Sequence, residues 1–145
     1  MGKEDKPRVS VDGVSVTRSF DKTVSKAAIA AARAAMEKAL AGGKLAVVKQ
    51  VKKSETGFGV QVTIAEIAHD AAKKTITMKI AVAMTIKPGP RIIRASGAES
   101  GGTLPDANPR KLPADAAYLA REILKKLGPK VRKALEAQAA RLAKA

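Results

Sequence analysis

The chain has 145 residues, which is enough for one domain of ordinary size with a single core. Hydrophobic residues make up 46% and aromatic residues 2%, a composition that excludes a disordered chain and predicts an aliphatic core. Lys and Arg number 28 against 13 Asp and Glu, and the formal net charge of +15 favours an anionic partner: nucleic acid, a lipid surface or an acidic protein. Charge that serves only solubility is the alternative. Without cysteine, the chain can form no disulfide, thiolate nucleophile or Cys-ligated metal site.

Residues 1–7 are charged and are expected to form a flexible N-terminus. No apolar run is long enough to span a bilayer, and MGKEDKPRVS lacks the apolar core of a secretory signal. The compartment is therefore left open: the periplasm or envelope if a signal was removed, and otherwise the cytoplasm.

The first expected strand, Arg8 to Ser19, changes its alternation part-way along. Val9 and Val11 share one parity, whereas Val14 and Val16 share the other. The dipeptide at positions 12 and 13 is Asp-Gly, which predicts a turn or bulge there because glycine tolerates the backbone angles required.

An alanine-rich helix is expected from a cap at Asp21 or Thr23 to about Ala41, where Gly42 and Gly43 end it. Bulky side chains are few in this segment, so alanine dominates its packed face. A helix of this kind can lie close to the element that it covers, and a sheet is the expected neighbour.

Three strands follow: Leu45 to Val51, a segment with Phe58, Val60, Val62 and Ile64 on one face, and Thr75 to Ile86. His69 to Lys74 is expected to be a loop. The parity of Glu66 places its carboxylate with Ile64 on the buried face, unless the strand ends or bulges there, and the bulge is the preferred interpretation.

The strand TITMKIAVAMTI has the clearest pattern in the chain. Its alternation predicts that Ile76, Ile80, Val82 and Met84 are buried and that Lys79 and Thr85 are not. The second face carries short polar side chains, which is typical of a sheet surface open to solvent or to a partner.

Pro88, Gly89 and Pro90 end this strand, and Arg91 to Ala95 is expected to return as a short edge strand. Ser96 to Lys111 is expected to be a loop. A helix then begins near Pro113, and Gly128-Pro129 is expected to kink it or to start a fresh helix.

These elements predict an α+β two-layer sandwich with the order β-α-β-β-β-(β)-α. Two main helices cover one face of a mainly antiparallel sheet of three to five strands. The predicted divisions are a flexible segment at 1–7, an α+β domain at 8–127 and a basic helical extension at 128–145.

Groups with catalytic potential are sparse. The single histidine, His69, lies beside Asp70 in the expected loop, and a metal site needs three or four ligands. Gly57-Phe58-Gly59 opens a strand rather than a helix, so it does not fit a phosphate-binding loop. We therefore expect no catalytic residue, no metal and no cofactor.

Basic side chains are the remaining signal, since nearly half of the excess positive charge lies in residues 110–145. Helical spacing places several of them together or on adjoining positions of the last helix. The candidate anion-binding residues are Lys125, Lys126, Lys130, Arg132, Lys133 and Arg141. A solvated helix face is the alternative interpretation.

The order helix, three meandering strands, short return and long final helix, with PGPRIIRASGAES after the last regular strand, resembles small α/β modules of bacterial envelope proteins. These include the amino-terminal domain of TolB and outer-membrane assembly lipoproteins. The resemblance covers Val14 to Leu127 and implies two helices on one sheet face and a role in binding rather than catalysis. The chain departs from these proteins in lacking a lipidated Cys and in its positive charge.

The sequence thus favours a non-enzymatic binding or assembly module of the bacterial envelope type, engaging another protein or an anionic surface, with oligomers possible. The alternative is a nucleic-acid-associated protein whose C-terminal helix contacts duplex phosphates without sequence preference. The scarcity of aromatic residues disfavours recognition of single strands by base stacking.

Overall fold

The computed structural model describes residues 6–52, 56–87, 91–93 and 98–144, with side chains described as far as Leu142. In chain order the elements are β1 (Arg8–Val16), α1 (Lys22–Ala41), β2 (Ala46–Val47), β3 (Gly57–Asp70), β4 (Thr75–Lys87), β5 (Arg91–Ile93), β6 (Glu99–Leu104) and α2 (Leu112–Lys144). Most of the expected flexible N-terminus and the expected turn at 88–90 lie outside the described residues.

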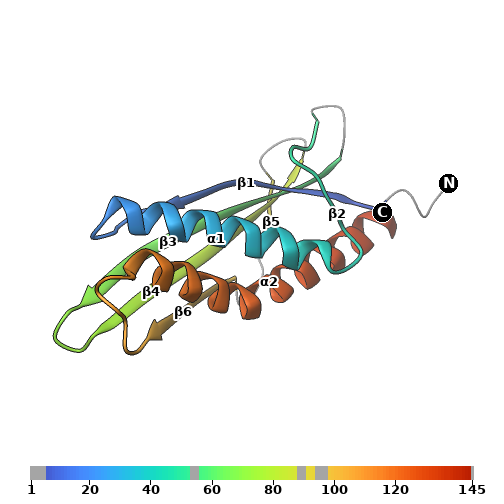
Figure 1. Cartoon of the computed structure of the whole chain (residues 1–145). Helices are drawn as coiled ribbons and strands as arrows, with labels where there is room; N and C mark the ends of the chain where they lie inside the picture. Colours follow the sequence, from blue (N-terminus) through green and yellow to red (C-terminus); the bar gives the residue numbers. More distant parts are fainter. Residues whose placement is uncertain (1–5, 53–55, 88–90, 94–97, 145) are drawn as a thin grey trace.

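The predicted two-layer α+β sandwich is confirmed, with α1 and α2 side by side on one face of the sheet (Figure 1). The sheet has six strands in the order β2-β1-β3-β4-β5, and β6 also pairs with β4. Strand β1 runs parallel to both β2 and β3, while β4 is antiparallel to β3, β5 and β6. The sheet therefore has one strand more than the upper limit expected.

Helix α1 forms as the sequence predicts. The Asp21 side chain caps it by accepting a hydrogen bond of 2.9 Å from the Val24 backbone N–H, and Gly42 follows its last turn. Alanine occupies half of its buried positions: Val24, Ala28, Ala31, Ala32, Met36 and Leu40. These small side chains bring α1 close to its neighbours.

Two bulges keep the hydrophobic pattern in register. The pairing of β1 with β3 shifts between Val11 and Gly13, which confirms the change of parity expected there. The pairing of β3 with β4 shifts between Ile64 and Glu66, so Glu66 lies opposite Lys79 and is only half-buried. Ile67 takes the next core position instead and is 2% exposed.

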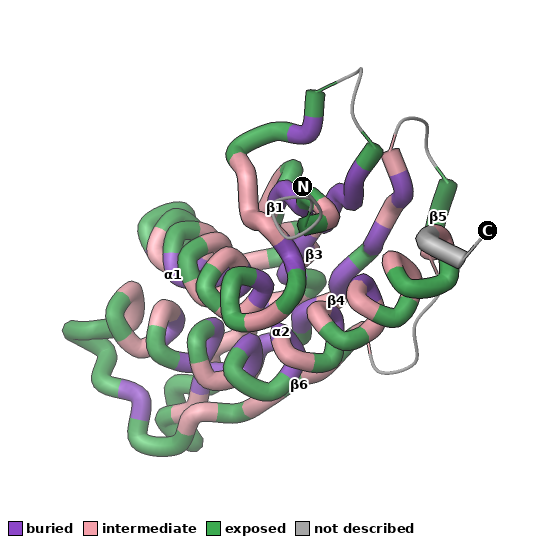
Figure 2. The backbone as a smooth tube through the Cα atoms, turned by 90° about the vertical axis from the view of Figure 1, so that its right-hand side faces the viewer, coloured by how far each residue is buried: buried purple, intermediate pink, exposed green. Residues whose placement is uncertain are grey.

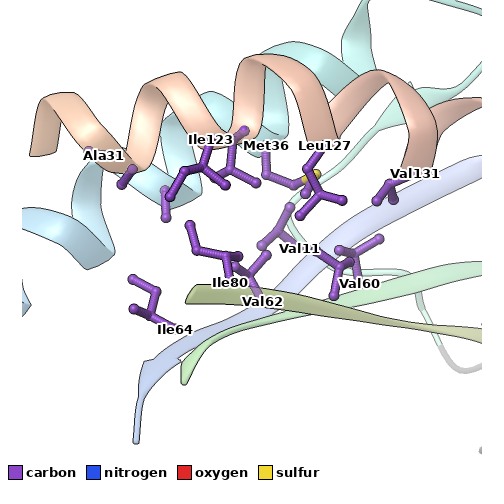
Figure 3. Packing of buried hydrophobic residues seen from close by; sticks show 14 of the residues in the cluster. Val11, Ala31, Met36, Val60, Val62, Ile64, Ile80, Ile123, Leu127 and Val131 are labelled. Carbon is purple, nitrogen blue, oxygen red and sulfur yellow. The ribbon is translucent and has the colours of Figure 1, made fainter. Parts of the chain in front are cut away.

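The core lies between the sheet and the two helices. On β4, Ile76, Ile80, Val82 and Met84 are all buried, whereas Lys79 is exposed and Thr85 is half-buried, as predicted. Figure 3 shows Ile123 and Leu127 of α2 facing Ile80 across this core. The aliphatic side chains exclude water from one face of the sheet and provide the main stabilisation of the fold.

Strand β6 corrects the expectation of a loop from Ser96 to Lys111. Residues 99–104 pair with β4 from Ala81 to Ile76, and the Val82 N–H donates to the Ala98 carbonyl at 2.8 Å. The short β5 pairs with the other half of β4, where Ile86 lies opposite Arg91. The two short strands thus share one edge of β4.

The strand expected from Leu45 to Val51 is also shorter than predicted, because only Ala46–Val47 pairs with β1. Val51 leaves the line of β2 and is buried against Gly57, where a Cβ atom would lie 3.1 Å from both methyl groups of Val51. His69 lies within β3 opposite Ile76 and not in a loop.

Helix α2 continues through Gly128 and Pro129, so the expected fresh start does not occur. Gly128 lies at a close contact between α2 and α1, since a Cβ atom there would lie 2.5 Å from the Ala39 Cβ. Beyond this point Val131 and Leu135 are buried in the same core as the rest of the helix. Packing against α1 and the sheet offsets the hydrogen bond that Pro129 cannot donate.

Candidate functional site

The six candidate basic residues of α2 fall on two flanks of the helix. One flank faces α1 and carries Lys125 and Arg132. The other carries Lys126, Lys130, Lys133 and Arg141, which are all exposed and which we call the basic stripe. Spacings of four, three and eight residues keep this stripe on one side of the helix over about 22 Å, at 1.5 Å of rise per residue.

Arg132 is engaged within the fold. Its Nη1 donates to the Ala39 carbonyl at 3.3 Å, and its Nε is buried without a partner among the described residues. Glu136, one turn later, accepts a hydrogen bond from the Lys44 backbone N–H. Together they hold the C-terminal end of α1, where carbonyl groups carry partial negative charge.

Lys125 is bound locally. Its Nζ lies 2.8 Å from Glu122 Oε2, and this hydrogen bond together with the carboxylate charge raises the pKa of Lys125 above 10.5. Lys125 also lines a groove between the helices, of about 400 Å³, with Lys38 and Arg121. Its charge therefore adds to the field of the surface while its ammonium is already paired.

The basic stripe has no such engagement. Among the residues with described side chains, none of its four cations lies within ion-pair distance of a carboxylate. Unpaired cations held at fixed spacing on a rigid helix produce a positive potential that attracts anions. This stripe is the part of the sequence-predicted site that the fold brings together.

No helix in the described part of the chain covers the opposite face of the sheet, where most side chains are small. Residues directed to this face include Ser15 of β1, Gln61 and Thr63 of β3, Thr77, Lys79, Ala81 and Ala83 of β4, Ile92 of β5, and Gly101 and Thr103 of β6. Ile92 is 70% exposed. We call this surface the open sheet face, and it matches the expectation of a lightly covered sheet surface.

A polar cluster fastens one part of the open sheet face. Asp12 accepts a hydrogen bond of 2.6 Å from Ser10 and forms an ion pair of 2.9 Å with Lys87. The cluster passes over Gly59, where a Cβ atom would meet Asp12, Lys87 and Thr85. It links β1 to β4 across β3, and its groups satisfy one another, which fits a structural role.

His69 has surroundings that the sequence did not indicate. Its ring lies 5.4 Å from the Phe20 ring, and its Nε2 is buried with no partner among the described residues. It lines a hollow of about 380 Å³ beside Asp21 and Pro113, where both helices begin. Within the described part of the chain, no nucleophile or second titratable group is hydrogen-bonded to His69.

Metal-ligating side chains do not gather in groups of three or more within the described part of the chain. Its helices also include none that is long and apolar enough to cross a bilayer.

The sequence matches no protein-family model and no curated protein. Among solved structures it is similar to the hypothetical protein CT253 from Chlamydia trachomatis, with 14% identity and a TM-score of 0.62 over 91% of this chain and 99% of that one. Protein XCC0632 from Xanthomonas campestris, described as belonging to the DUF330 family, has 11% identity and a TM-score of 0.56 over 94% of this chain and 91% of that one. A minor lipoprotein from Acinetobacter baumannii has 11% identity and a TM-score of 0.49, covering 92% and 93%.

The first two likenesses establish the fold, which this chain shares with bacterial proteins of similar length. The narrower resemblance to the amino-terminal domain of TolB stays a prediction.

Proposed function

We propose that this chain is a non-enzymatic binding module of the bacterial envelope type, which engages an acidic protein partner through the basic stripe of α2. The observation that carries the proposal is the division of the six candidate cations. Lys125 and Arg132 are occupied by partners within the fold, whereas the basic stripe is exposed and unpaired among residues with described side chains.

The rigidity of the stripe supports recognition rather than mere solubility. Leu127, Val131 and Leu135 alternate with the stripe along α2 and are at most 1% exposed, so the backbone beneath the cations is fixed by the core. Preorganised charges lose less conformational entropy on binding than charges on a frayed helix. Their position therefore favours a partner with matching carboxylates.

The test is a charge reversal with a matched control. Lys126→Glu, Lys130→Glu and Lys133→Glu are combined in one variant, and Lys22→Glu, Lys26→Glu and Lys38→Glu, all exposed on α1, are combined in the other. Binding to labelled polyglutamate is measured by fluorescence anisotropy at low salt. We expect at least about a tenfold loss for the α2 variant and a smaller loss for the α1 variant. Equal losses would mean that only net charge matters and would contradict the proposal.

Duplex DNA is the second candidate, favoured by the placement of four cations along one flank of a long helix. Each neutralised phosphate contributes about −0.9 to the slope of log affinity against log salt, so four contacts predict a slope of roughly −3 to −4 without sequence preference. Duplex binding with this slope, lost in the α2 variant and accompanied by no binding to polyglutamate, would replace the acidic-protein proposal by the nucleic-acid one.

The envelope assignment in this proposal is supported by the element order that the chain shares with envelope modules. Cell fractionation of the native host, followed by immunodetection of the protein, tests it directly. Recovery in the periplasmic or membrane fraction is expected. Recovery only with cytoplasmic markers would contradict the envelope assignment and leave the binding proposal intact.

A further inference from the structure

Strand β6 forms an edge of the sheet, and its backbone pairing can be read from its register. The Val82 N–H donates to Ala98, and the same register places Ile80 opposite Ser100 and Met78 opposite Gly102. In an antiparallel pair the hydrogen-bonded residues alternate with residues whose backbone groups point away. The N–H and C=O groups of Glu99, Gly101 and Thr103 are therefore directed outward from β4.

These outward groups are accessible. Glu99, Gly101 and Thr103 are all exposed, and no hydrogen bond to their backbone groups is found outside the β4 pairing among the described residues. The close approach of the Thr77 and Thr103 hydroxyl oxygens, 3.3 Å apart, agrees with a non-hydrogen-bonded pair at this position. An unpaired row of alternating donors and acceptors is a template for one more strand.

The other described edges are shorter or interrupted. On the opposite side of the sheet, β2 has only two residues. Beyond β2, β1 is itself an edge from Ser10 to Val16, but the bulge between Val11 and Gly13 interrupts it and Arg33 donates a hydrogen bond to the Val11 carbonyl. Strand β5, which pairs with the same edge of β4 as β6, has three residues and includes the charged Arg91.

Strand β6 has six residues, ESGGTL, with no proline, no lysine and no bulge in its pairing with β4. Short length, bulges and charged side chains are the usual protections of an edge. Strand β6 has one charge only, on its first residue Glu99, so it is the edge best suited to accept a partner.

The basic stripe borders this edge. A Cβ atom on Gly102 of β6 would lie 3.4 Å from Leu119 and 3.5 Å from Ile123, so these residues mark the flank of α2 that covers β6. Lys126 is three residues after Ile123, and Lys130 is seven residues after it, which keeps both on that flank. Figure 1 shows α2 lying beside β6 along this side of the molecule.

We propose that β6 is a strand-addition site that binds an extended acidic segment of a partner protein. The partner's backbone pairs with the outward groups of Glu99, Gly101 and Thr103. Every second side chain of the added strand points to the helix side, where carboxylates meet Lys126 and Lys130. This inference rests on the proposed function, because it specifies how the acidic partner reaches the basic stripe.

The charge of the chain decides between occupants. A second copy of this chain would bring another net charge of +15 to the same edge, so self-pairing is opposed by repulsion. An acidic segment instead gains attraction along the flank of α2. The side chains on its other face pass the small residues of the open sheet face and the carboxylate of Glu99, so acidic residues are expected at alternate positions only.

The test uses a short labelled peptide in which Glu alternates with Thr, measured by fluorescence anisotropy on the whole chain. Thr103→Pro removes one outward N–H, at a position where an edge strand tolerates proline. Thr103→Val is the matched control, since it removes only the hydroxyl. We expect binding to the wild type, a loss of at least about tenfold in Thr103→Pro and less than about twofold in Thr103→Val. Thermal melts of the two variants should agree, which shows that both fold.

Backbone pairing and charge are separated by two further measurements. A peptide of the same sequence with methylated backbone nitrogens should bind weakly, and amide exchange at Gly101 should slow when the unmodified peptide binds. Equal binding of both peptides, with the Thr103→Pro variant unaffected and the α2 charge reversal inactive, would overturn strand addition while the proposed function stands. Failure of the wild type to bind any polyanion would overturn both. A dimer that Thr103→Pro disperses would assign the edge to a second copy and overturn the proposal.

Discussion

The two broad faces of this molecule are built from opposite kinds of side chain. The helix face carries long cations, among them Lys22, Lys26, Lys38, Arg121 and the basic stripe. The open sheet face carries mainly Thr, Ala, Ser and Gly, with its few charges of both signs. Figure 2 shows the exposed positions following the outer sides of α1 and α2, with buried positions beneath them. Slightly more than half of the net positive charge thus lies on the two helices that cover the hydrophobic core.

This difference shows how burial determines which side chains lie on the two sides of one sheet. The buried side of β4 holds large aliphatic groups because two helices remove it from water, whereas its open side is short and polar because no layer covers it. Under the two proposals above, the helix face attracts the acidic partner and the sheet edge between the two faces binds its backbone.

The largest expected effect comes from placing a carboxylate on the buried side of β4 rather than on its exposed side. Ile80→Asp places an unpaired carboxylate at a position that is 1% exposed, and it should prevent folding. Ala83→Asp places the same group on the exposed side of β4 and should change the free energy of unfolding by less than about 0.5 kcal/mol. Thermal melts followed by circular dichroism compare the two. Equal loss of structure would contradict the assigned register.

The next effect concerns the contact between the helices. Gly128→Ala adds a methyl group 2.5 Å from the Ala39 Cβ, and the resulting overpacking should lower the free energy of unfolding by about 1–3 kcal/mol. In an exposed helix the same change would stabilise by roughly 1 kcal/mol. The double variant with Ala39→Gly should recover part of the loss in urea denaturation. Stabilisation by the single change would mean that the helices lie farther apart.

A smaller effect distinguishes the two flanks of α2. Arg132→Met removes the hydrogen bond to the Ala39 carbonyl and should cost about 1–2 kcal/mol of unfolding free energy. Lys133→Met, at the next position on the exposed flank, should cost less than about 0.5 kcal/mol. Chemical denaturation of both variants measures the difference. A larger loss of unfolding free energy in Lys133→Met than in Arg132→Met would mean that the Arg132 hydrogen bond does not stabilise the fold.

The smallest expected effect concerns the ion pair between Glu122 and Lys125 on the surface of α2. Glu122→Gln removes the carboxylate that raises the pKa of Lys125, so this pKa should fall toward 10.5, as measured by NMR titration of the lysine side chain. Because the folded pKa is raised, the stabilisation is present below the unfolded pKa and is lost as the pH rises above 10.5. A pKa of Lys125 that stays unchanged in Glu122→Gln would contradict this ion pair.

The sequence predicted the core of the fold because alternation on β4 and alanine content in α1 are local signals. The bulges at Asp12-Gly13 and near Glu66 were also readable, since each breaks a parity that neighbouring residues establish. Strand β6 was missed because ESGGTL contains two glycines, no aromatic residue and only one β-branched residue, Thr103. It forms through pairing with β4, a partner distant in sequence.

The candidate site was predicted only in part. Spacing identifies which cations share a helix, but it does not show that Arg132 faces Ala39, a residue 93 positions earlier in the chain. The continuation of α2 through Pro129 is likewise a tertiary effect, because the buried contacts of Val131 and Leu135 outweigh a local helix breaker. The outward groups of β6 depend on a strand that the pattern did not indicate.

Helix α2 follows all the described strands in the sequence, and this order has a consequence for how the protein folds. The contacts of α2 with α1 and β4 join segments far apart in sequence, and such contacts form slowly. While the chain is being synthesised, the aliphatic side of β4 is complete long before Leu135 has left the ribosome. During that interval the incomplete sheet exposes the aliphatic side of β4, which can associate with other apolar surfaces. Its safe maturation therefore depends on rapid closure by the last helix or on temporary shielding by a chaperone.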